Sequence, residues 1–523
     1  MKTKPLGPFL GINTRLPDYS LRTKEGDFVK DAVNVDLLND GSFRRRRSAD
    51  IAQAMTAPHS LGHGYLVRAS VLYKVTLPTY TETLASLLST NDPMSYALEG
   101  DLYCTNGTDR LRITSAGTVY PWAMPTPAEP VVTQIAGTLK KGTYQVAVSY
   151  CNTTTGEESG VSASNNFHVS SDNAGLRITV PSATTGATHA NIYVSTINGG
   201  VPFYQKQVAL GGTTDVTALV AGREAVQRFE EPMPAGSRVF FFNGRMCVVN
   251  GKTLYYGLPY RHGYYLPLEG RIDFHEDIAI AVANQAGIYV ATASQTFFFA
   301  GLSVAEIEAV QNPLPYGAVK GTEFMLPRID QVGWFGRHGV VVADKHGQIS
   351  PLMEKQVALS TVPASGVSGV FEDGDVVRVV SCGWCVNLSN GGATRYTGYD
   401  FTSYWGDFAT SSDGLYNLRG VAKVPALVML GTEDFSTERL KMVPAAYVGG
   451  EFGGPMELVV TTPKQGTYSY VARDYSPDME MQRIDPGKGL KDNWYSFTLN
   501  NRDGFDFTLA SVSFAPVASG RRI

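Results

Sequence analysis

Cysteine is scarce in this chain of 523 residues, which has five: Cys104, Cys151, Cys247, Cys382 and Cys385. An odd and low number predicts no disulfide framework and favours synthesis in a reducing compartment. Long apolar runs are absent too, and none approaches the ~18 residues that a membrane-spanning helix needs. The first residues include two lysines but no apolar segment after them, so we expect neither a signal peptide nor a membrane span.

Charge is also sparse, at 18% of residues, and its balance is slightly negative, with a formal net charge of −4. A protein that grips nucleic acid needs many lysines and arginines against the phosphates. The composition therefore disfavours tight binding of DNA, although a near-neutral chain can surround DNA without holding it. The hydrophobic content of 43% is enough for folded cores and excludes a disordered chain.

The familiar catalytic motifs are missing. The chain contains no G-x-S-x-G elbow, no Walker loop and no H-E-x-x-H. Cys382 and Cys385 form a C-x-x-C, but zinc would need two further ligands; two ordinary cysteines in a strand fit better. Asp273, His275 and Asp277 would share one face of a strand and could hold a metal, although a polar loop is the commoner explanation. We therefore expect no catalytic residue, cofactor or metal, and no enzyme.

Turn residues and aromatic residues are plentiful instead. Glycine occurs 54 times and aromatic residues make up 11% of the chain, which favours an all-β fold. In 239–257, Asn243-Gly244 and Asn250-Gly251 separate three apolar runs. Asn-Gly suits the positive φ angles of a type I′ turn, so this segment predicts a three-stranded meander.

Similar strand-turn-strand units recur at 96–122, 278–301, 332–352 and 367–398. They start at irregular intervals of roughly 35 to 55 residues, near the length of a propeller blade. A propeller protects its strand edges by radial repetition. We expect a β-propeller-like core, with a stacked β-sandwich as the alternative.

Two segments depart from this rhythm. After the proline-rich stretch 121–130, strict alternation in 144–150 and 190–195 predicts half-buried strands, and about a hundred residues of this kind suit an inserted immunoglobulin or fibronectin type III-like sandwich. From about Tyr447, strands and a hairpin at Asp503-Gly504 predict a C-terminal antiparallel sheet. The expected domains are an N-terminal assembly arm (1–60), first propeller blades (61–124), the inserted domain (125–232), remaining blades (233–445) and the C-terminal β-sheet (446–523).

Helical signals are few. In 26–38, Phe28, Val29, Ala32, Val33 and Leu37 lie near helical spacing. We expect one or two turns of helix here, weakened by β-branched valines.

The sharpest charge run is Arg44 to Arg47, which follows the predicted turn at Asp40-Gly41. Strand geometry would place two arginines on each face. One pair could then grip an acidic partner or a phosphate while the other meets solvent. The plainer alternative is a solvated strand end.

The stretch 9–48 resembles the N-terminus of the tail nozzle proteins of short-tailed bacteriophages, also called tail tubular protein B. The related tail hub proteins share the part A-x-N…G-x-x-R, found here at Ala32, Asn34, Gly41 and Arg44. Gly26 and Ala32 also match the pattern of this family. The other matching positions are expected to act in assembly, and they are Gly11, Ile12, Pro17, Asp18, Leu21, Arg22, Asn34, Gly41, Arg44, Arg45, Arg46 and Arg47.

The resemblance implies a structural virion protein, made in the host cytoplasm and located in the virion tail. Six copies would form a homohexameric ring below the head-to-tail adaptor protein, and double-stranded DNA would pass through the ring without sequence-specific contacts. Tail fibre or tip proteins would be further partners. This chain is shorter than a typical nozzle and carries the inserted domain, which suggests an outward decoration or a docking arm for fibres.

Two other functions are open at this point. A phage adhesin or carbohydrate-binding module would use exposed aromatic rings such as Tyr255, Tyr256, Tyr264 and Tyr265 for stacking, although these rings also suit the core between blades. A propeller glycan hydrolase would instead need a carboxylate pair in a cleft.

Overall fold

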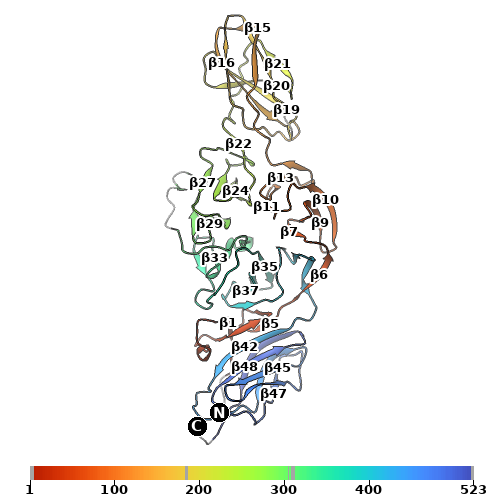
Figure 1. Ribbon diagram of the computed structural model, residues 1–523, viewed down its shortest axis with the longest axis vertical. Helices are drawn as coiled ribbons and strands as arrows, with labels where there is room; N and C mark the ends of the chain where they lie inside the picture. Colours follow the sequence, from red (N-terminus) through yellow and green to blue (C-terminus); the bar gives the residue numbers. More distant parts are fainter. Residues whose placement is uncertain (1–4, 183–185, 304–305, 308–312, 520–523) are drawn as a thin grey trace. The chain divides into compact units, whose positions relative to one another are not determined.

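The computed structural model describes residues 5–182, 186–303, 306–307 and 313–519. It is all-β, with a β-propeller-like core, an inserted sandwich and a C-terminal antiparallel domain, as expected (Figure 1). The chain divides into two compact units, 1–69 with 73–83 and 279–523, and 70–72 with 84–278. Within the described residues, no helix is long and apolar enough to cross a membrane.

The first unit contains a succession of small antiparallel sheets with the character of propeller blades. Neighbouring sheets contact one another in chain order, through β28 with β32, β31 with β35, and β35 with β39. Their strands are β28 (Ile280–Asn284), β29 (Gly287–Ala291) and β30 (Thr296–Phe299); β31 (Phe324–Leu326), β32 (Gln331–Gly336), β33 (Gly339–Ala343) and β34 (Ile349–Pro351); β35 (Ser368–Asp373), β36 (Val376–Ser381), β37 (Trp384–Asn387) and β38 (Ala393–Arg395); and β39 (Ser403–Trp405), β40 (Phe408–Ser411) and β41 (Gly414–Gly420).

A strand from the start of the chain completes the last of these sheets. β6 (Ser48–Ala54) pairs antiparallel with β41, more than 350 residues later, and gives the sheet order β39-β40-β41-β6. β39 and β40 then contact β7 (His59–Gly62), which lies in a sheet with β8 (Tyr65–Arg68), β9 (Val71–Thr76) and β10 (Thr81–Leu87). Pairing of early and late strands in one blade protects edges that would otherwise be open.

The second unit holds two further four-stranded sheets. One comprises β11 (Ser95–Glu99), β12 (Asp101–Thr105), β13 (Arg110–Ile113) and β14 (Val119–Pro121). The other comprises β23 (Arg238–Phe242), β24 (Arg245–Asn250), β25 (Thr253–Tyr256) and β27 (Arg271–Asp273). The predicted meander is thus confirmed. Asn243 and Gly244 both have positive φ, as a type I′ turn requires, but the second turn is formed by Gly251 and Lys252, with Asn250 still in the strand.

The inserted sandwich also lies in the second unit and has its own core. Its sheets have the orders β15-β18-β21 and β17-β16-β19-β20, and Val146, Ile178 and Ile192 are among the side chains buried between them. The strands are β15 (Val131–Leu139), β16 (Gly142–Cys151), β17 (Asn165–Val169), β18 (Ala174–Thr179), β19 (His189–Ser195), β20 (Pro202–Ala209) and β21 (Thr213–Val216). After it come the paired strands β22 (Glu231–Pro232) and β26 (Tyr264–Tyr265).

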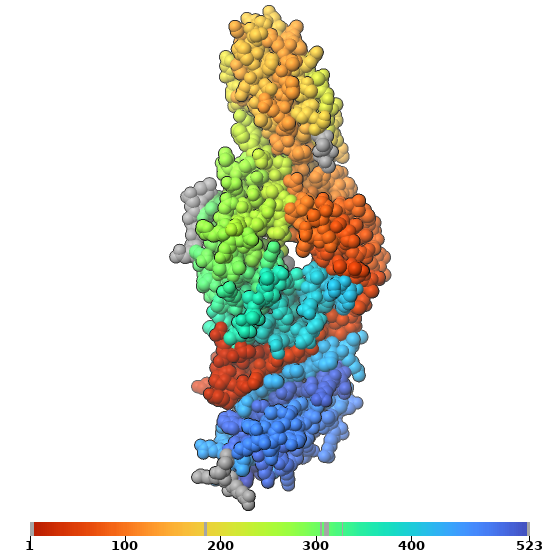
Figure 2. Space-filling view, viewed as in Figure 1, coloured from red at the N-terminus to blue at the C-terminus, as the bar shows by residue number. Residues whose placement is uncertain are grey.

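The start and the end of the chain build one two-sheet domain in the first unit. One layer is the sheet β4-β5-β49-β44-β47, and the other is β3-β42-β48-β45-β46, which continues through β38 into the blade β35–β38. Figure 2 shows the N-terminal residues directly against the C-terminal ones. The strands are β1 (Phe9–Ile12), β2 (Asp27–Val29), β3 (Asp31–Val33), β4 (Val35–Leu37), β5 (Phe43–Arg45), β42 (Ala426–Glu433), β43 (Lys441–Met442), β44 (Ala446–Phe452), β45 (Glu457–Thr462), β46 (Gly466–Val471), β47 (Glu480–Ile484), β48 (Tyr495–Asn501), β49 (Phe507–Phe514) and β50 (Val517–Ala518).

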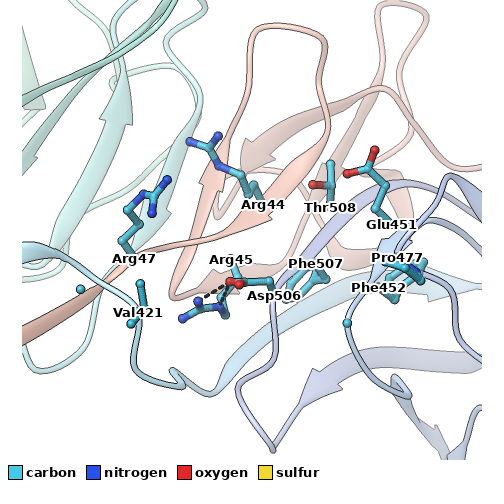
Figure 3. Close-up of a pocket in the computed structure, with 12 residues that line it drawn as sticks. Arg44, Arg45, Arg47, Val421, Glu451, Phe452, Pro477, Asp506, Phe507 and Thr508 are labelled. Carbon is cyan, nitrogen blue, oxygen red and sulfur yellow. Dashed lines mark hydrogen bonds and ion pairs between the residues drawn. The ribbon is translucent and has the colours of Figure 1, made fainter.

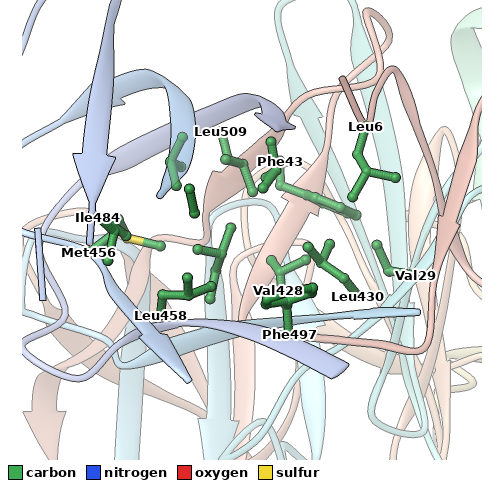
Figure 4. Close-up of a cluster of buried hydrophobic side chains, with 14 of the residues drawn as sticks. Leu6, Val29, Phe43, Val428, Leu430, Met456, Leu458, Ile484, Phe497 and Leu509 are labelled. Atoms are coloured by element: carbon green, nitrogen blue, oxygen red, sulfur yellow. The ribbon is translucent and has the colours of Figure 1, made fainter. Parts of the chain in front are cut away.

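The core of this domain joins residues from both ends of the sequence. Phe43 is fully buried and lies at 5.0 Å, centroid to centroid, from Phe9, and both belong to one cluster with Val428 and Leu509 (Figure 4). Residues 5–60 are therefore not a separate arm in this structure. They supply inner strands of the C-terminal domain and, through β6, one strand of a blade.

The expected helix within 26–38 is wrong. The segment forms β2, β3 and β4, which pair in three different sheets. Asn34 has a φ of 58°, so the chain changes direction between β3 and β4. The apolar spacing that suggested a helix arises because three short strands each bury one or two valines or alanines. Two 3-10 turns, η1 (Asp18–Ser20) and η2 (Pro327–Ile329), lie wholly within the described residues.

Candidate interaction site

The twelve residues predicted to act in assembly are mostly internal. Gly11 shows why: its φ is +93°, and an added Cβ would lie 2.7 Å from the Ala393 backbone nitrogen. Gly41 has a φ of +79°, and a Cβ there would lie 2.5 Å from the Pro8 Cβ. The buried members of the set are Gly11, Ile12, Leu21, Asn34, Gly41, Arg45 and Arg46; Asp18 and Arg44 are half-buried; Pro17, Arg22 and Arg47 are exposed.

Asn34 and Arg46 form one buried polar group. The Asn34 amide donates to Thr397 Oγ1 and to the Pro425 carbonyl, both at 2.9 Å. Its Oδ1 accepts from Arg46 Nε at 2.9 Å, and Arg46 also donates to the Thr397 carbonyl at 3.0 Å. The guanidinium lies over the rings of Tyr396 and Tyr399, 5.2 and 4.7 Å from their centroids. A planar, five-donor cation suits such a site far better than lysine would.

Arg44 and Arg45 also find partners in the same chain. Arg45 is nearly buried, and its Nε donates to Asp506 Oδ1 at 2.8 Å while its NH1 donates to the Ala422 carbonyl at 3.0 Å. Arg44 pairs with Asp373 and lies 3.8 Å from the buried Asp36. Burial pushes the pKa of Asp373 upward, but the charge and hydrogen bond of Arg44 bring the pKa below its ordinary value.

Arg47 alone of the four arginines is exposed. Within the described part of the chain, no hydrogen bond or ion pair engages its guanidinium; only its carbonyl is used, as acceptor for Arg46. We expected two arginines on each face of a strand. Instead, Arg44 to Arg46 contact partners within the chain and Arg47 is exposed. The reason is distant in sequence, because the partners Asp373, Thr397 and Asp506 lie more than 300 residues after the arginines.

The arginines border an open pocket of about 300 Å³, which we call the basic pocket (Figure 3). In Figure 3 the guanidinium groups of Arg44 and Arg47 extend to the same side of the pocket, whereas Arg45 turns toward Asp506. The lining residues are Arg44, Arg45, Arg47, Gly420, Val421, Glu451, Phe452, Gly453, Pro477, Asp506, Phe507 and Thr508. Sequence reasoning missed all the residues beyond Arg47, since nothing local marks them.

Arg47 also lines a second, much smaller cavity beside Tyr399 and Arg419. Arg47 therefore lines both cavities. Val421, next to it in the basic pocket, is 84% exposed. The arrangement presents a free cation and an apolar side chain together, which suits contact with an acidic or aromatic protein surface.

The two other candidate sites are the C-x-x-C at Cys382 and Cys385 and the metal site at Asp273. Cys382 and Gly383 form the turn of the hairpin β36–β37, with φ angles of 52° and 77°. Burial raises the pKa of Cys382, and burial followed by the charge of Asp36 raises the pKa of Cys385 to about 11. Neither thiol is therefore activated as a nucleophile. Among the described residues, no group of three or more histidines, cysteines or carboxylates could hold a metal ion, and Asp273 accepts from Thr253 and lies near Arg271.

The four tyrosines considered for sugar stacking are not a common exposed surface. Tyr264 is 1% exposed and Tyr256 is 7% exposed. Tyr255 and Tyr265 pack edge to face, 5.4 Å apart, against the same core. They serve the second unit's interior, so the feature that favoured a carbohydrate-binding surface is lost.

No family model matches this chain, and no curated protein matches it. Solved structures similar to it include an exo-β-1,3-galactanase from Phanerochaete chrysosporium with β-1,3-galactotriose, at 8% identity and a TM-score of 0.18, covering 90% of this chain and 100% of that chain. Another is a glycoside hydrolase family 43 arabinoxylan arabinofuranohydrolase from Bacillus subtilis in complex with cellotetraose, at 8% identity and a TM-score of 0.17, covering 90% of this chain and 96% of that chain.

The expectation that the chain is not an enzyme is contradicted by these neighbours, which are glycoside-cleaving enzymes. At this identity and TM-score, the similarity assigns no catalytic residue and no substrate to this chain.

Proposed function

We propose that the chain is a structural protein of a virion tail, of which several copies form a ring below the head-to-tail adaptor. The proposal starts from the resemblance of residues 9–48 to tail nozzle and tail hub proteins. The genome would leave through the ring, and fibre or tip proteins would attach around it. The net charge of −4 agrees with a lumen that lets DNA slide, since a basic lumen would retain it.

The observation that carries the proposal is that contacts with other segments of the chain fix the positions of the first residues. Gly11 packs closely against Ala393, and Gly41 packs closely against Pro8. The Asn34 side chain donates a hydrogen bond to Thr397. These contacts hold β5 in place and leave Arg47, two residues beyond the end of that strand, exposed beside the basic pocket. A rigid, preorganised contact surface reduces the entropy cost of assembly.

The test is negative-stain imaging of phage heads assembled without this protein and then mixed with the purified chain. We expect a new ring or short tube at the single portal vertex. A matched control is the same mixture with the Arg47→Glu variant, which keeps the internal contacts of Arg44 to Arg46.

Three results would count against a tail role. Unchanged heads together with binding of the isolated chain to host cells would favour an adhesin. Loss of polysaccharide on incubation with the chain would favour a glycan hydrolase. Heads that stay bare without either activity would leave no support for the ring.

A further inference from the structure

A second pocket of the first unit has the opposite charge. It has a volume of about 490 Å³ and is formed where β1, η1 and β2 meet the end of β42. We call it the acidic pocket. Four carboxylates and one guanidinium line it, together with apolar and small polar residues: Leu6, Phe9, Asp18, Tyr19, Leu21, Arg22, Asp27, Phe28, Leu430, Gly431, Thr432, Glu433, Asp434, Phe435 and Ser436.

The carboxylates are only partly neutralised from within the chain. Arg22 Nε donates to Glu433 Oε1 at 2.8 Å, and Lys30 pairs with Asp18 at the surface. Burial raises the pKa of Glu433, although the charge of Arg22 opposes that rise. Because four carboxylates and one guanidinium line the pocket, a further cation placed there would meet a net negative charge.

Two exposed aromatic residues lie together at the acidic pocket, Tyr19, which lines it, and Trp494, which contacts Tyr19; we call this pair the Tyr19–Trp494 lip. Tyr19 is 67% exposed and Trp494 is 39% exposed, and their ring centroids lie 6.4 Å apart. Leu6, Phe9 and Leu21 are buried at the floor. Aromatic faces beside carboxylates are a favourable environment for a guanidinium group, which both stacks and donates hydrogen bonds.

The acidic and basic pockets lie at opposite ends of β49. Phe507 and Thr508, at its start, line the basic pocket. Toward its end, Val512 accepts a hydrogen bond from the Leu6 nitrogen at 2.7 Å, and the Phe514 ring lies 6.0 Å from that of Phe435; both Leu6 and Phe435 line the acidic pocket. At ~3.3 Å per residue, the eight residues of β49 separate the two pockets by about 25 Å.

We propose that the acidic pocket of one copy receives Arg47 of the next copy. Exposed Val421 beside Arg47 would then meet the Tyr19–Trp494 lip. The contact is head to tail, because it joins two different patches at opposite ends of one domain, as a closed ring requires. This inference rests on the proposed function, for which it specifies the partner: a second copy of this chain. Opposite charge selects the pairing, and the apolar contact supports it.

A charge-swap experiment tests the pairing. Mass photometry and light scattering would follow assembly of the full-length chain as Arg47→Glu, Asp18→Lys and the double variant. Asp18 suits this test because its pair with Lys30 is exposed, with side chains 42% and 49% accessible. Each single variant should weaken self-association at least tenfold, and the double variant should recover it, since Glu at 47 then meets Lys at 18. Lys488→Glu, the same charge change at an exposed residue that lines neither pocket, should assemble like the wild type.

The outcomes separate this inference from the proposed function. If the wild type forms rings and the single variants form them equally well, the pairing is overturned and the ring stands. If the singles dissociate, remain folded by circular dichroism and are not rescued in the double variant, the pairing is also overturned. A wild-type chain that stays monomeric, both alone and on phage heads, overturns ring and pairing together. Binding of the acidic pocket only to a basic peptide from another tail protein would assign the pocket to that partner instead.

Discussion

At the scale of single residues, the four consecutive arginines have four different environments. Arg45 and Arg46 are buried, Arg44 is half-buried against carboxylates, and Arg47 is exposed. A buried guanidinium with hydrogen bonds on several sides is costly to replace, because its partners lose their donors. A run that looks uniform in sequence thus combines structural residues with one residue free for contact.

The difference between Arg45 and Arg47 can be measured. Arg45→Met should destabilise the first unit by about 1–3 kcal/mol, because the Ala422 carbonyl and Asp506 lose charge-assisted hydrogen bonds. Arg47→Met should change stability by less than about 0.5 kcal/mol. Hydrogen exchange of the β5 and β49 amides reports both. Equal effects from the two substitutions would contradict the assignment of Arg45 as structural.

Acid should weaken the Arg44–Asp373 pair. The folded-state pKa of Asp373 is lowered, so its contribution is present above the unfolded-chain value of about 3.9 and is lost as the pH falls through the folded-state value. Asp373→Asn should cost up to about 1 kcal/mol at neutral pH, because the pair is partly solvated, and nothing in strong acid.

The measurement for this pair is the unfolding free energy of both proteins as a function of pH. Repeating it in an Arg44→Met background gives a double-mutant cycle. There the pH-dependent difference should shrink; an unchanged difference would mean that Arg44 is not its cause.

At the scale of elements, closely packed glycines with positive φ set the backbone path of the short N-terminal strands. β4 and β5 are joined by a turn in which Gly41 closely approaches Pro8 and Phe9. The same close approach occurs at Gly11 against Ala393. Several of the positions predicted to act in assembly therefore fix the backbone, which explains why few of them reach the surface.

Gly41→Ala should be strongly destabilising. Its φ of +79° and the 2.5 Å approach to the Pro8 Cβ combine left-handed strain with a clash, for an expected cost of about 2–4 kcal/mol. Gly374→Ala is the matched control, since its φ is +61° but nothing lies within 4 Å of the added Cβ; it should cost about 1 kcal/mol. Thermal unfolding compares them, and a smaller loss at Gly41 than at Gly374 would exclude the clash.

At the scale of the whole molecule, one core is formed within a single segment and another is shared by distant segments. The inserted sandwich is closed around its own residues. The C-terminal domain is not closed without the first fifty residues, which contribute Phe9, Ile12, Val35 and Phe43 to it. The C-terminal domain can therefore fold only after nearly the whole chain has been synthesised.

Deleting residues 1–47 should prevent folding of the C-terminal domain. Seven large apolar side chains would be lost from its core, at about 1.5–3 kcal/mol each, a sum comparable to the total stability of a typical domain. They are Leu6, Phe9, Ile12, Val29, Val35, Leu37 and Phe43. Replacing residues 131–229 by a flexible linker should leave the first unit resistant to trypsin. Limited proteolysis with mass spectrometry compares the two; a protected 426–514 region in the N-terminal deletion would contradict the shared core.

The sequence by itself determined the all-β class, the meander at 239–257, the inserted sandwich and the C-terminal sheet, because Asn-Gly turns and strict alternation are local signals read within a few residues. It also singled out Arg44 to Arg47 and the glycines around them. Only the tertiary structure decided that residues 27–37 are strands, that three of the four arginines are internal, and which residues complete the basic and acidic pockets. These features depend on partners such as Asp373, Glu433 and Asp506, hundreds of residues away. Side-chain burial and ion pairing are set by such long-range contacts, which no local pattern encodes.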